Sequence, residues 1–313
     1  MNVHFDPVGD GQTIRDRLYA GDLVIMSATP ESLAFINWAR EMIEEAFAPY
    51  DPQTAQFHLD LHDFADRLSA LKPRFIHHPR TWELMRALVM RHVSDPIATY
   101  LDVPRLRGIS SDGYLTSGPG YAFDKHRDTW WSAPMQQINW WLPIYSYTSD
   151  SAMAFHPECW DRPVENSSGE FDYYDWNLFG RAQSSQNVTK DTRVQPKIVQ
   201  DPRPDFDFPV TPVVPEGGII TFSGQHMHSS IPNTSGLTRF SIDFRTVNIV
   251  DVRNGKGAPN ADSHPRGTSL RDFRRCIDRE AMPEELALSV DPRIVDAEAV
   301  VFKPQVLVQS LAS

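Results

Sequence analysis

Apolar residues in the first hundred positions recur at intervals of three and four, the spacing of one helical face. The clearest case lies between Thr29, a typical N-cap, and Pro49, which ends the pattern. We also expect helices over 61–71 and 81–92, and a short strand within 22–28. The apolar face of the first helix comprises Phe35, Trp38, Ala39, Met42, Ile43 and Ala46.

From residue 104 the pattern changes to short β-branched and aromatic runs between Gly, Pro and Ser clusters, such as "MQQINWWLPIY" and "TRFSIDFRTVNIV". Several short strands separated by such turn residues favour an all-β sandwich or barrel. We therefore predict a single domain, 1–313, in which a mostly helical support (1–103) braces a β core (104–250). A C-terminal loop, a helical piece near 270–277 and a tail make up 251–313.

Residues 156–209 interrupt the predicted strands with a long polar segment that is rich in aromatic residues. A long irregular insertion in a compact domain is usually functional or disordered. The segment could act as a lid and close over a site with Tyr173, Tyr174 or Trp176. It could equally form a small satellite core.

Composition and charge narrow the function classes. The chain of 313 residues is 41% hydrophobic and 23% charged, and its net charge of -11 comes without a long basic run. Binding to nucleic acid or to an anionic membrane surface is therefore disfavoured. The two cysteines imply no disulfide framework, the first residues do not resemble a signal peptide, and no run approaches the ~20 apolar residues of a membrane helix. We expect a soluble, cytoplasmic protein with a small-molecule substrate, and the oligomeric state stays open.

The pattern His-x-Asp occurs three times, and two strand residues with this spacing point to the same side and can share a metal. His4 with Asp6 lies near a terminus that we expect to fray. His58 with Asp60 leads into a predicted helix, where residues two apart diverge. His126 with Asp128 lies at a predicted strand edge in the β region, so we favour this pair.

A second signal lies in "EGGIITFSGQHMHSSIPNTSGLTRFSIDFRTV", which predicts a strand, a turn and a returning strand. His226 and His228 have the same strand parity, so periodicity does not choose between them. In the returning strand, polar residues alternate with Phe240, Ile242 and Phe244. That polar face could belong to a site or to an amphipathic strand in water. It consists of Arg239, Ser241, Asp243 and Arg245.

The two signals suit one kind of metal site. Two histidines and a carboxylate on neighbouring strands form the facial triad that leaves three positions open on non-haem Fe(II). An arginine nearby offers a planar fork for a carboxylate. The mouth of a barrel is a usual place for such a pocket.

The His-x-Asp, the "FSGxxxHxSxPNxS" run and the arginine that follows resemble the Fe(II)/2-oxoglutarate-dependent oxygenases, with the phytanoyl-CoA-dioxygenase-like branch closest. The resemblance covers roughly 104–250 and implies a double-stranded β-helix (jelly roll, cupin-like) with bracing helices. In this family an arginine commonly follows the distal histidine ligand by eleven residues, which is the step from His228 to Arg239. The resemblance therefore implies that His228 is the ligand and leaves His226 a supporting or structural role.

Carried over by position, the resemblance implies that His126, Asp128 and His228 hold iron. Arg239 and Ser241 would bind the distal carboxylate of 2-oxoglutarate, Ser230 would contact this cosubstrate, and Trp141 matches a tryptophan of the strand after the first two ligands.

Three further residues are candidates for the substrate. Gln137 and Asn139 share strand parity with Trp141, so they face the pocket if it does. They could instead satisfy buried backbone groups or face solvent. Arg245 could bind an anionic substrate or pair with Asp243.

The implied activity uses Fe(II), 2-oxoglutarate and O2, hydroxylates an unactivated carbon of a small molecule, and releases succinate and CO2. The same triad also supports desaturation, epoxidation and cyclisation. Two alternatives stay open: a cupin-type metalloenzyme that does not use 2-oxoglutarate, and a non-catalytic jelly-roll binding protein.

Overall fold

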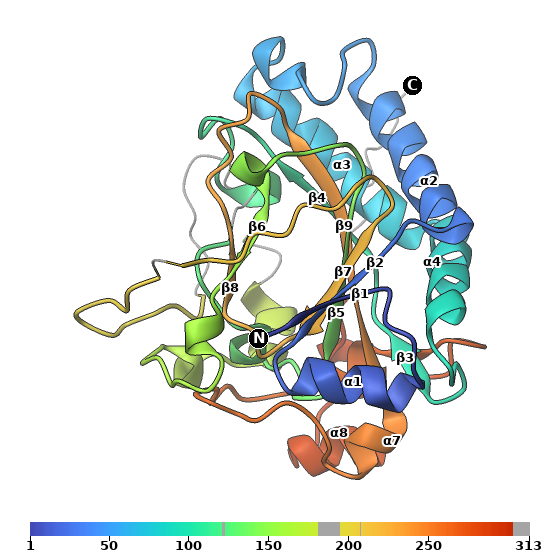
Figure 1. The fold of residues 1–313 in the computed structure, drawn as a ribbon, viewed down its shortest axis with the longest axis vertical. Coiled ribbons are helices and arrows are strands. Elements are labelled where there is room, and N and C mark those ends of the chain that lie inside the picture. Colours follow the sequence, from blue (N-terminus) through green and yellow to red (C-terminus); the bar gives the residue numbers. More distant parts are fainter. Residues whose placement is uncertain (121–122, 181–194, 207, 303–313) are drawn as a thin grey trace.

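The computed structural model describes residues 1–120, 123–180, 195–206 and 208–302. Its centre is a large, mostly antiparallel sheet in the order β1-β2-β7-β5-β9-β3-β10, with β4 also paired to β9 (Figure 1). The strands of this sheet are β1 (Val3–Phe5), β2 (Leu23–Met26), β3 (Thr99–Leu101), β4 (Arg105–Ile109), β5 (Ile138–Pro143), β7 (Ile219–Ser223), β9 (Arg239–Asn248) and β10 (Arg274–Arg275).

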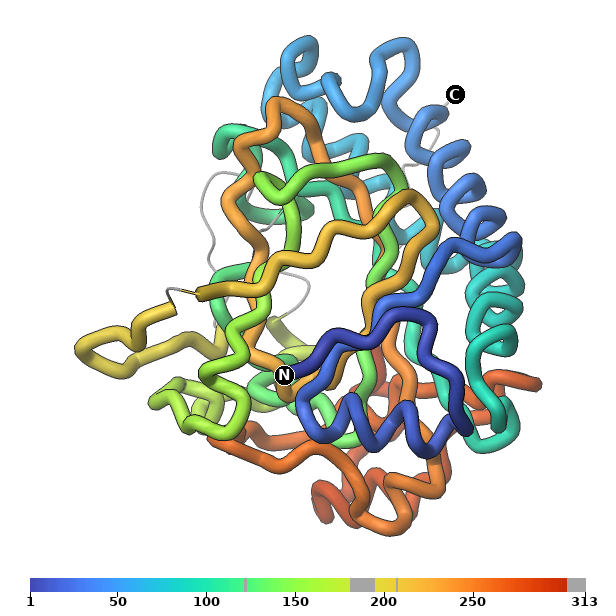
Figure 2. The backbone as a smooth tube through the Cα atoms, viewed as in Figure 1, coloured from blue at the N-terminus to red at the C-terminus, as the bar shows by residue number. Residues whose placement is uncertain are grey.

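A smaller second layer faces this sheet. It contains β6 (Met153–Phe155) and β8 (His228–Ser230), which pair antiparallel. His126 adds a bridge to His228 on one side, and Val210 adds a bridge to Phe155 on the other. Figure 2 shows these green and orange segments side by side, while the yellow loop near residue 200 projects from the body.

Helices cover the outer face of the large sheet. They are α1 (Gly11–Tyr19), α2 (Pro30–Phe47), α3 (Leu61–His77) and α4 (Pro79–His92). Short helices follow in the second half: α5 (Tyr173–Asp175), α7 (Ile249–Arg253), α8 (Glu284–Val290) and α9 (Ala297–Val300). In the described residues no helix is long and apolar enough to cross a membrane.

The predicted helix after Thr29 is confirmed as α2. Thr29 and Ser32 form a reciprocal capping box, and the residues of the predicted apolar face that are fully buried are Phe35, Ala39, Met42 and Ile43. These side chains join a core cluster with α3 and the outer face of β9. Phe35 lies 6.5 Å from Phe244 between ring centroids, so α2 rests directly on this strand.

The faces of β9 alternate as predicted. Phe240, Ile242 and Phe244 are fully buried against the helices, while Arg239, Asp243 and Arg245 line a pocket on the opposite face. A ten-residue strand therefore separates the apolar core from a polar cavity.

Several boundaries differ from the prediction. The helix expected over 61–71 continues to His77 with Pro73 inside it, and α1 and β1 were not predicted. The helical piece expected near 270–277 is present only at its start, as the 3-10 helix Ser269–Asp272, and β10 follows where the prediction continued the helix. The predicted helical support also contributes strands to the main sheet, because β2 pairs with β7 and β3 with β9.

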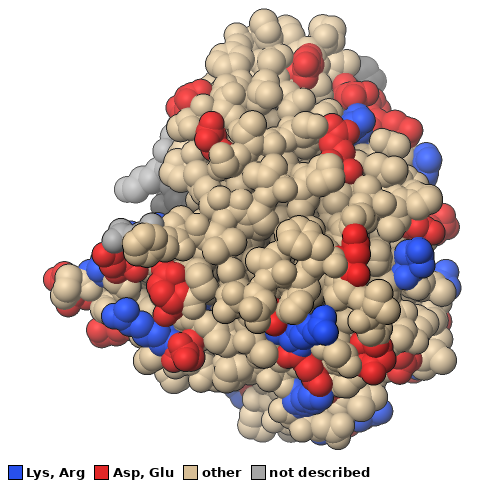
Figure 3. Space-filling view, in the orientation of Figure 1, with Lys and Arg blue, Asp and Glu red and all other residues tan. Residues whose placement is uncertain are grey.

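The mixed α+β class is confirmed. The double-stranded β-helix stays a prediction, because within the described residues the second layer has two short paired strands, β6 and β8, with one isolated bridge on either side. The division of the chain into support, core and C-terminal segments also stays a prediction. Charges on the face in Figure 3 are interspersed and form no continuous basic area.

Candidate metal centre

Two of the three His-x-Asp pairs have structural roles. His4 binds the Asp22 carboxylate at 2.8 Å, and β1 pairs in parallel with β2, so this terminus belongs to the sheet and the expected fraying is wrong. Asp60 is the N-cap of α3 and accepts bonds from the backbone N–H groups of His62 and Asp63. Neither pair converges on one point.

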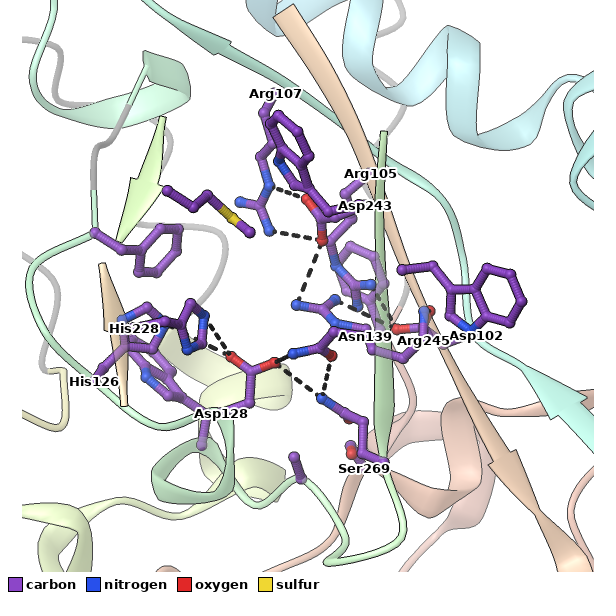
Figure 4. A pocket seen from close by; sticks show the side chains of 18 of the residues that line it. Asp102, Arg105, Arg107, His126, Asp128, Asn139, His228, Asp243, Arg245 and Ser269 are labelled. Atoms are coloured by element: carbon purple, nitrogen blue, oxygen red, sulfur yellow. Dashed lines mark hydrogen bonds and ion pairs between the residues drawn. The ribbon is translucent and has the colours of Figure 1, made fainter. Parts of the chain in front are cut away.

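The third pair meets His228. One nitrogen of each imidazole and one oxygen of Asp128 lie within 4.8 Å of one another. His126 Nε2 lies 3.5 Å, and His228 Nε2 3.8 Å, from Asp128 Oδ1 (Figure 4). This is the donor set of a facial triad, and these three residues could hold a metal ion.

Backbone pairing places the two histidines side by side. The N–H of His126 donates to the carbonyl of His228 at 3.0 Å, and the reverse bond is 2.9 Å long. After His126 the chain is extended at Arg127, so Asp128 returns to the same side and starts a 3-10 helix, Asp128–Trp131. The Arg127 side chain points the other way and is fully buried against Asp262. The alternation predicted from sequence therefore holds, although Asp128 lies in a helical turn.

Backbone carbonyls hold both imidazoles in orientation. Nδ1 of His126 lies 2.7 Å from the Asp124 carbonyl, and Nδ1 of His228 lies 2.9 Å from the His226 carbonyl. A carbonyl only accepts, so each Nδ1 carries the proton and each Nε2 keeps a lone pair directed at Asp128 Oδ1. Metal-binding histidines typically have such a partner on the other ring nitrogen.

The protonation states suit metal binding. Burial lowers the pKa of His228 to about 4, and the neighbouring His126 contributes to this shift, so the ring is neutral at pH 7. Burial alone would raise the pKa of Asp128. The imidazoles of His126 and His228, when they carry a second proton, and the charge of Arg245 outweigh it and hold that pKa well below its ordinary value. A neutral imidazole and an ionised carboxylate are the forms that bind a metal.

Two amides hold the other oxygen of the carboxylate. Asn139 Nδ2 donates to Asp128 Oδ2 at 2.7 Å, and Gln137 Nε2 donates to the same oxygen at 2.9 Å. We call these two residues the amide clamp. Oδ1 is then directed at the two histidines. Gln137 and Asn139 also line the pocket, as expected, and their proposed contact with substrate stays a prediction.

His226 lies outside this cluster. Its ring is fully buried against Trp160, with 4.6 Å between ring centroids, and against Phe155 and Phe222. Burial lowers the pKa of His226 to about 3, so the ring is neutral. Its contribution to the site is its backbone carbonyl, which orients His228.

Arg239 is a buried cation at the N-terminal end of β9. The residue is 5% exposed, and its Nη1 donates to the Ser151 carbonyl at 2.5 Å. Nε is buried without a hydrogen-bond partner, and among the described residues no carboxylate forms an ion pair with this guanidinium. It lies 5.6 Å from the Trp141 ring centroid. Burial lowers the pKa of Arg239 to about 10, so it stays charged at pH 7. A buried charge of this kind suits an anionic ligand.

The other residues named for the cosubstrate lie nearby. Trp141 and Ser230 line the same pocket as Arg239. Ser241 follows Arg239 on the same face of β9, and its Oγ is buried with no hydrogen-bond partner. It does not line the pocket wall, so its contact with a ligand stays a prediction.

Arg245 takes part in a chain of ion pairs. It lies 3.5 Å from Asp243 and 3.4 Å from Asp102. Arg107 binds Asp243 at 2.5 Å, and Arg105 binds Asp102 at 2.5 Å. We call this row of five side chains the ion-pair ladder. The predicted pairing of Arg245 with Asp243 is therefore confirmed.

Sequence reasoning missed three members of the ladder: Asp102, Arg105 and Arg107. The alternation in "RLRGI" carried a signal, because it places both arginines on one face of a strand. Nothing in the sequence placed Asp102 beside Arg245.

The pocket that joins these groups has a volume of ≈ 420 Å³. Tyr173 and Trp176 of the 156–209 segment line it. They also pack with Phe171, Tyr174 and Val300 in a small cluster. The "FDYYDWN" stretch therefore forms a small satellite core that also lines one wall of the pocket, and its role as a lid stays a prediction. Residues 181–194 and 207 of the predicted lid lie outside the described residues.

No protein-family model matches this chain, and no curated protein matches its sequence. Among solved structures, the non-haem monooxygenase ThoJ in its nickel complex is 14% identical, with 75% of this chain and 77% of that chain covered and a TM-score of 0.36. EvdO2 from Micromonospora carbonacea var. aurantiaca, solved with 2-oxoglutarate, is 11% identical, with 77% and 92% covered and a TM-score of 0.40.

A third structure is SnoN, a non-haem α-ketoglutarate-dependent epimerase from nogalamycin biosynthesis. It is 14% identical, with 76% and 84% covered and a TM-score of 0.36. Likenesses this remote carry no argument for a reaction or for the role of any residue, and the phytanoyl-CoA-dioxygenase-like branch stays a prediction.

Proposed function

We propose that this protein is a non-haem Fe(II)- and 2-oxoglutarate-dependent oxygenase that acts on a small molecule. One observation carries the proposal. Two imidazole nitrogens and one carboxylate oxygen converge in a pocket that also contains a buried guanidinium for which the described residues offer no ion-pair partner. The two imidazoles and the carboxylate suit a ferrous ion, and the guanidinium suits one carboxylate of a dicarboxylic keto acid.

His126, Asp128 and His228 would hold the iron. Three ligands leave three positions on an octahedral ion, enough for a bidentate keto acid and O2. The amide clamp on Oδ2 favours a monodentate carboxylate and so keeps these positions open. With iron, the keto acid and O2 bound, this site would supply the oxidising chemistry in which O2 is consumed, CO2 and succinate are formed and the substrate is oxidised.

Arg239 would bind the distal carboxylate of 2-oxoglutarate, with Ser241 and Ser230 as further contacts. An opposite charge at ~4 Å is worth about 4 kcal/mol near a protein surface before desolvation is subtracted. The guanidinium is already desolvated in the folded protein, and its Nε has no hydrogen-bond partner among the described residues. Trp141 beneath it restricts its position.

Hydroxylation of an unactivated carbon is the outcome that we favour. The candidate ligands His126 and His228 are buried and aromatic side chains line part of the pocket, which limits their contact with bulk water. We also keep two expectations within the proposal: a small-molecule substrate, because the composition is acidic, and a cytoplasmic location, because Cys159 and Cys276 form no disulfide.

Anaerobic addition of Fe(II) and 2-oxoglutarate tests the proposal. We expect a weak lilac charge-transfer absorption from the chelate. Arg239→Gln should still bind iron, with an affinity for 2-oxoglutarate at least about tenfold lower, because one charge-assisted contact is lost. Arg74→Gln, at an exposed ion pair on α3, is the matched control and should behave as wild type.

The two rivals give different results. Metal binding without the colour would favour a cupin-type enzyme that does not use 2-oxoglutarate. The absence of metal binding would favour a non-catalytic binding protein. If the colour appears, succinate formation across a panel of metabolites, with iron and ascorbate present, identifies the substrate.

A further inference from the structure

The ion-pair ladder lines the pocket beside the candidate metal centre and has more cations than anions. Its order is Arg105, Asp102, Arg245, Asp243, Arg107, so each carboxylate lies between two guanidinium groups. All five side chains line the pocket. Three arginines against two aspartates leave one positive charge, and the ladder ends in an arginine on each side.

Arg107 is the end that points into the cavity. Figure 4 shows its guanidinium directed into the open space across from His126, His228 and Asp128. Its Nε and Nη2 donate to the two oxygens of Asp243, at 2.5 and 3.3 Å. A guanidinium has five N–H donors, so the edge formed by Nη1 and the second N–H of Nη2 keeps the geometry for another carboxylate.

The charge balance of the pocket indicates how much negative charge a substrate can bring, and this step rests on the function proposed above. Among the described residues, the cationic lining residues are Lys72, Arg105, Arg107, Arg239 and Arg245, and the acidic ones are Asp102, Asp128, Asp243 and Asp272. Five against four leave one positive charge. A ferrous ion and a 2-oxoglutarate dianion cancel each other, so the surplus remains for the substrate.

The walls around Arg107 suit an apolar, flat body. Arg107 lies 5.3 Å from the ring centroid of Phe123, and Trp131, Tyr173 and Trp176 complete an aromatic wall of the same pocket. The cavity of ≈ 420 Å³ is within the usual range for small-molecule sites. It leaves room for a substrate beside a five-carbon keto acid.

We infer that the substrate is a small carboxylate with a single negative charge, held at the outer edge of the Arg107 guanidinium, with an apolar or aromatic body against the Phe123 and Trp131 side of the pocket. The substrate carboxylate would be a third contact of the Arg107 guanidinium, which already binds Asp243 and packs on the ring of Phe123. This arrangement directs the body of the substrate toward the candidate metal centre.

Matched pairs of acids and neutral amides test the inference without any substitution. The probes are benzoate and benzamide, 3-phenylpropanoate and 3-phenylpropanamide, and hexanoate and hexanamide. They are titrated anaerobically into the protein loaded with Fe(II) and 2-oxoglutarate, and binding is followed by tryptophan fluorescence, since Trp131, Trp141 and Trp176 line the pocket. We expect at least one acid to bind roughly tenfold more tightly than its amide. Equal binding within every pair, or no binding of any acid, overturns the inference.

Two variants locate the effect. Arg107→Gln should reduce the preference for the acid to about twofold or less. Arg105→Gln removes one charge from the other end of the same ladder and should keep most of the preference. If both variants lose it equally, the pocket acts only through its overall charge and the contact with Arg107 is wrong. If Arg107→Gln keeps the preference, the inference also fails.

This test can fail independently of the test of the proposed function. The lilac absorption of the chelate depends on the triad and Arg239, whereas the preference for acids depends on Arg107. A preference without the absorption contradicts the oxygenase and leaves the anion site. Weaker 2-oxoglutarate binding in Arg107→Gln, with the preference for acids intact, would assign Arg107 to the cosubstrate and contradict the inference.

Discussion

Asp128 is the residue whose surroundings were least visible in the sequence. Its two oxygens have different partners, because Oδ1 faces the two histidines while Oδ2 accepts from Gln137 and Asn139. A carboxylate that is free to rotate could bind a metal through both oxygens. The amide clamp opposes this rotation. Hydrogen bonds to a metal-binding side chain typically fix its orientation in this way and raise its affinity for the metal.

Replacing Asn139 with Leu should weaken metal binding. The variant loses the shorter of the two bonds to Oδ2, and loss of such a partner typically costs 10- to 100-fold in metal affinity. Competition for Co(II) against a chromophoric chelator measures the change directly.

The matched control is Ile138→Val on the same strand. Ile138 belongs to the core cluster on the opposite side of the strand, so this variant should lose about 1 kcal/mol of stability and keep its metal affinity. Unchanged metal affinity in both Asn139→Leu and Gln137→Met would show that the clamp does not orient the carboxylate.

At the scale of elements, local patterns predicted the right structures where one face was buried and the other was not. In α2 the apolar spacing, the cap at Thr29 and the stop before Pro49 agree with the structure. In β9 the alternation of Phe and Arg residues correctly separated core from pocket. Helix and strand geometry set these periods, so they are visible without knowledge of the partner surfaces.

Removing the cap of α2 should have a measurable effect. Thr29→Ala breaks the capping box with Ser32 and should lower the free energy of unfolding by ~1 kcal/mol. Urea denaturation followed by circular dichroism measures it. Thr54→Ala is the control, because Thr54 precedes a 3-10 helix without a side-chain cap bond, and should change stability by less than about 0.5 kcal/mol. Equal losses in the two variants would contradict the role of the cap.

At the scale of the whole molecule, the N-terminal third does more than cover the sheet. It supplies β2 beside β7 and β3 beside β9, and α2 and α3 bury the apolar face of β9. The candidate metal centre lies on the other face of this sheet. Its geometry therefore depends on residues that never touch it.

A fragment of residues 104–313 should not fold. It would expose Phe240, Ile242 and Phe244 and leave β7 and β9 without one neighbour each. We expect it to aggregate, to lack a cooperative thermal transition and to bind no metal, as measured by size-exclusion chromatography, circular dichroism and chelator competition. A cooperative transition together with metal binding would instead identify 104–313 as an independent domain.

The sequence by itself determined the α2 helix, the two faces of β9, and the candidate ligands His126, Asp128 and His228, the last with the help of a family resemblance. Only the tertiary structure brought the imidazoles beside the carboxylate and joined Asp102, Arg105 and Arg107 to Arg245. The reason is physical. Periodicity reports which way a side chain points, whereas its partner depends on strand register and on the path of loops across more than a hundred residues.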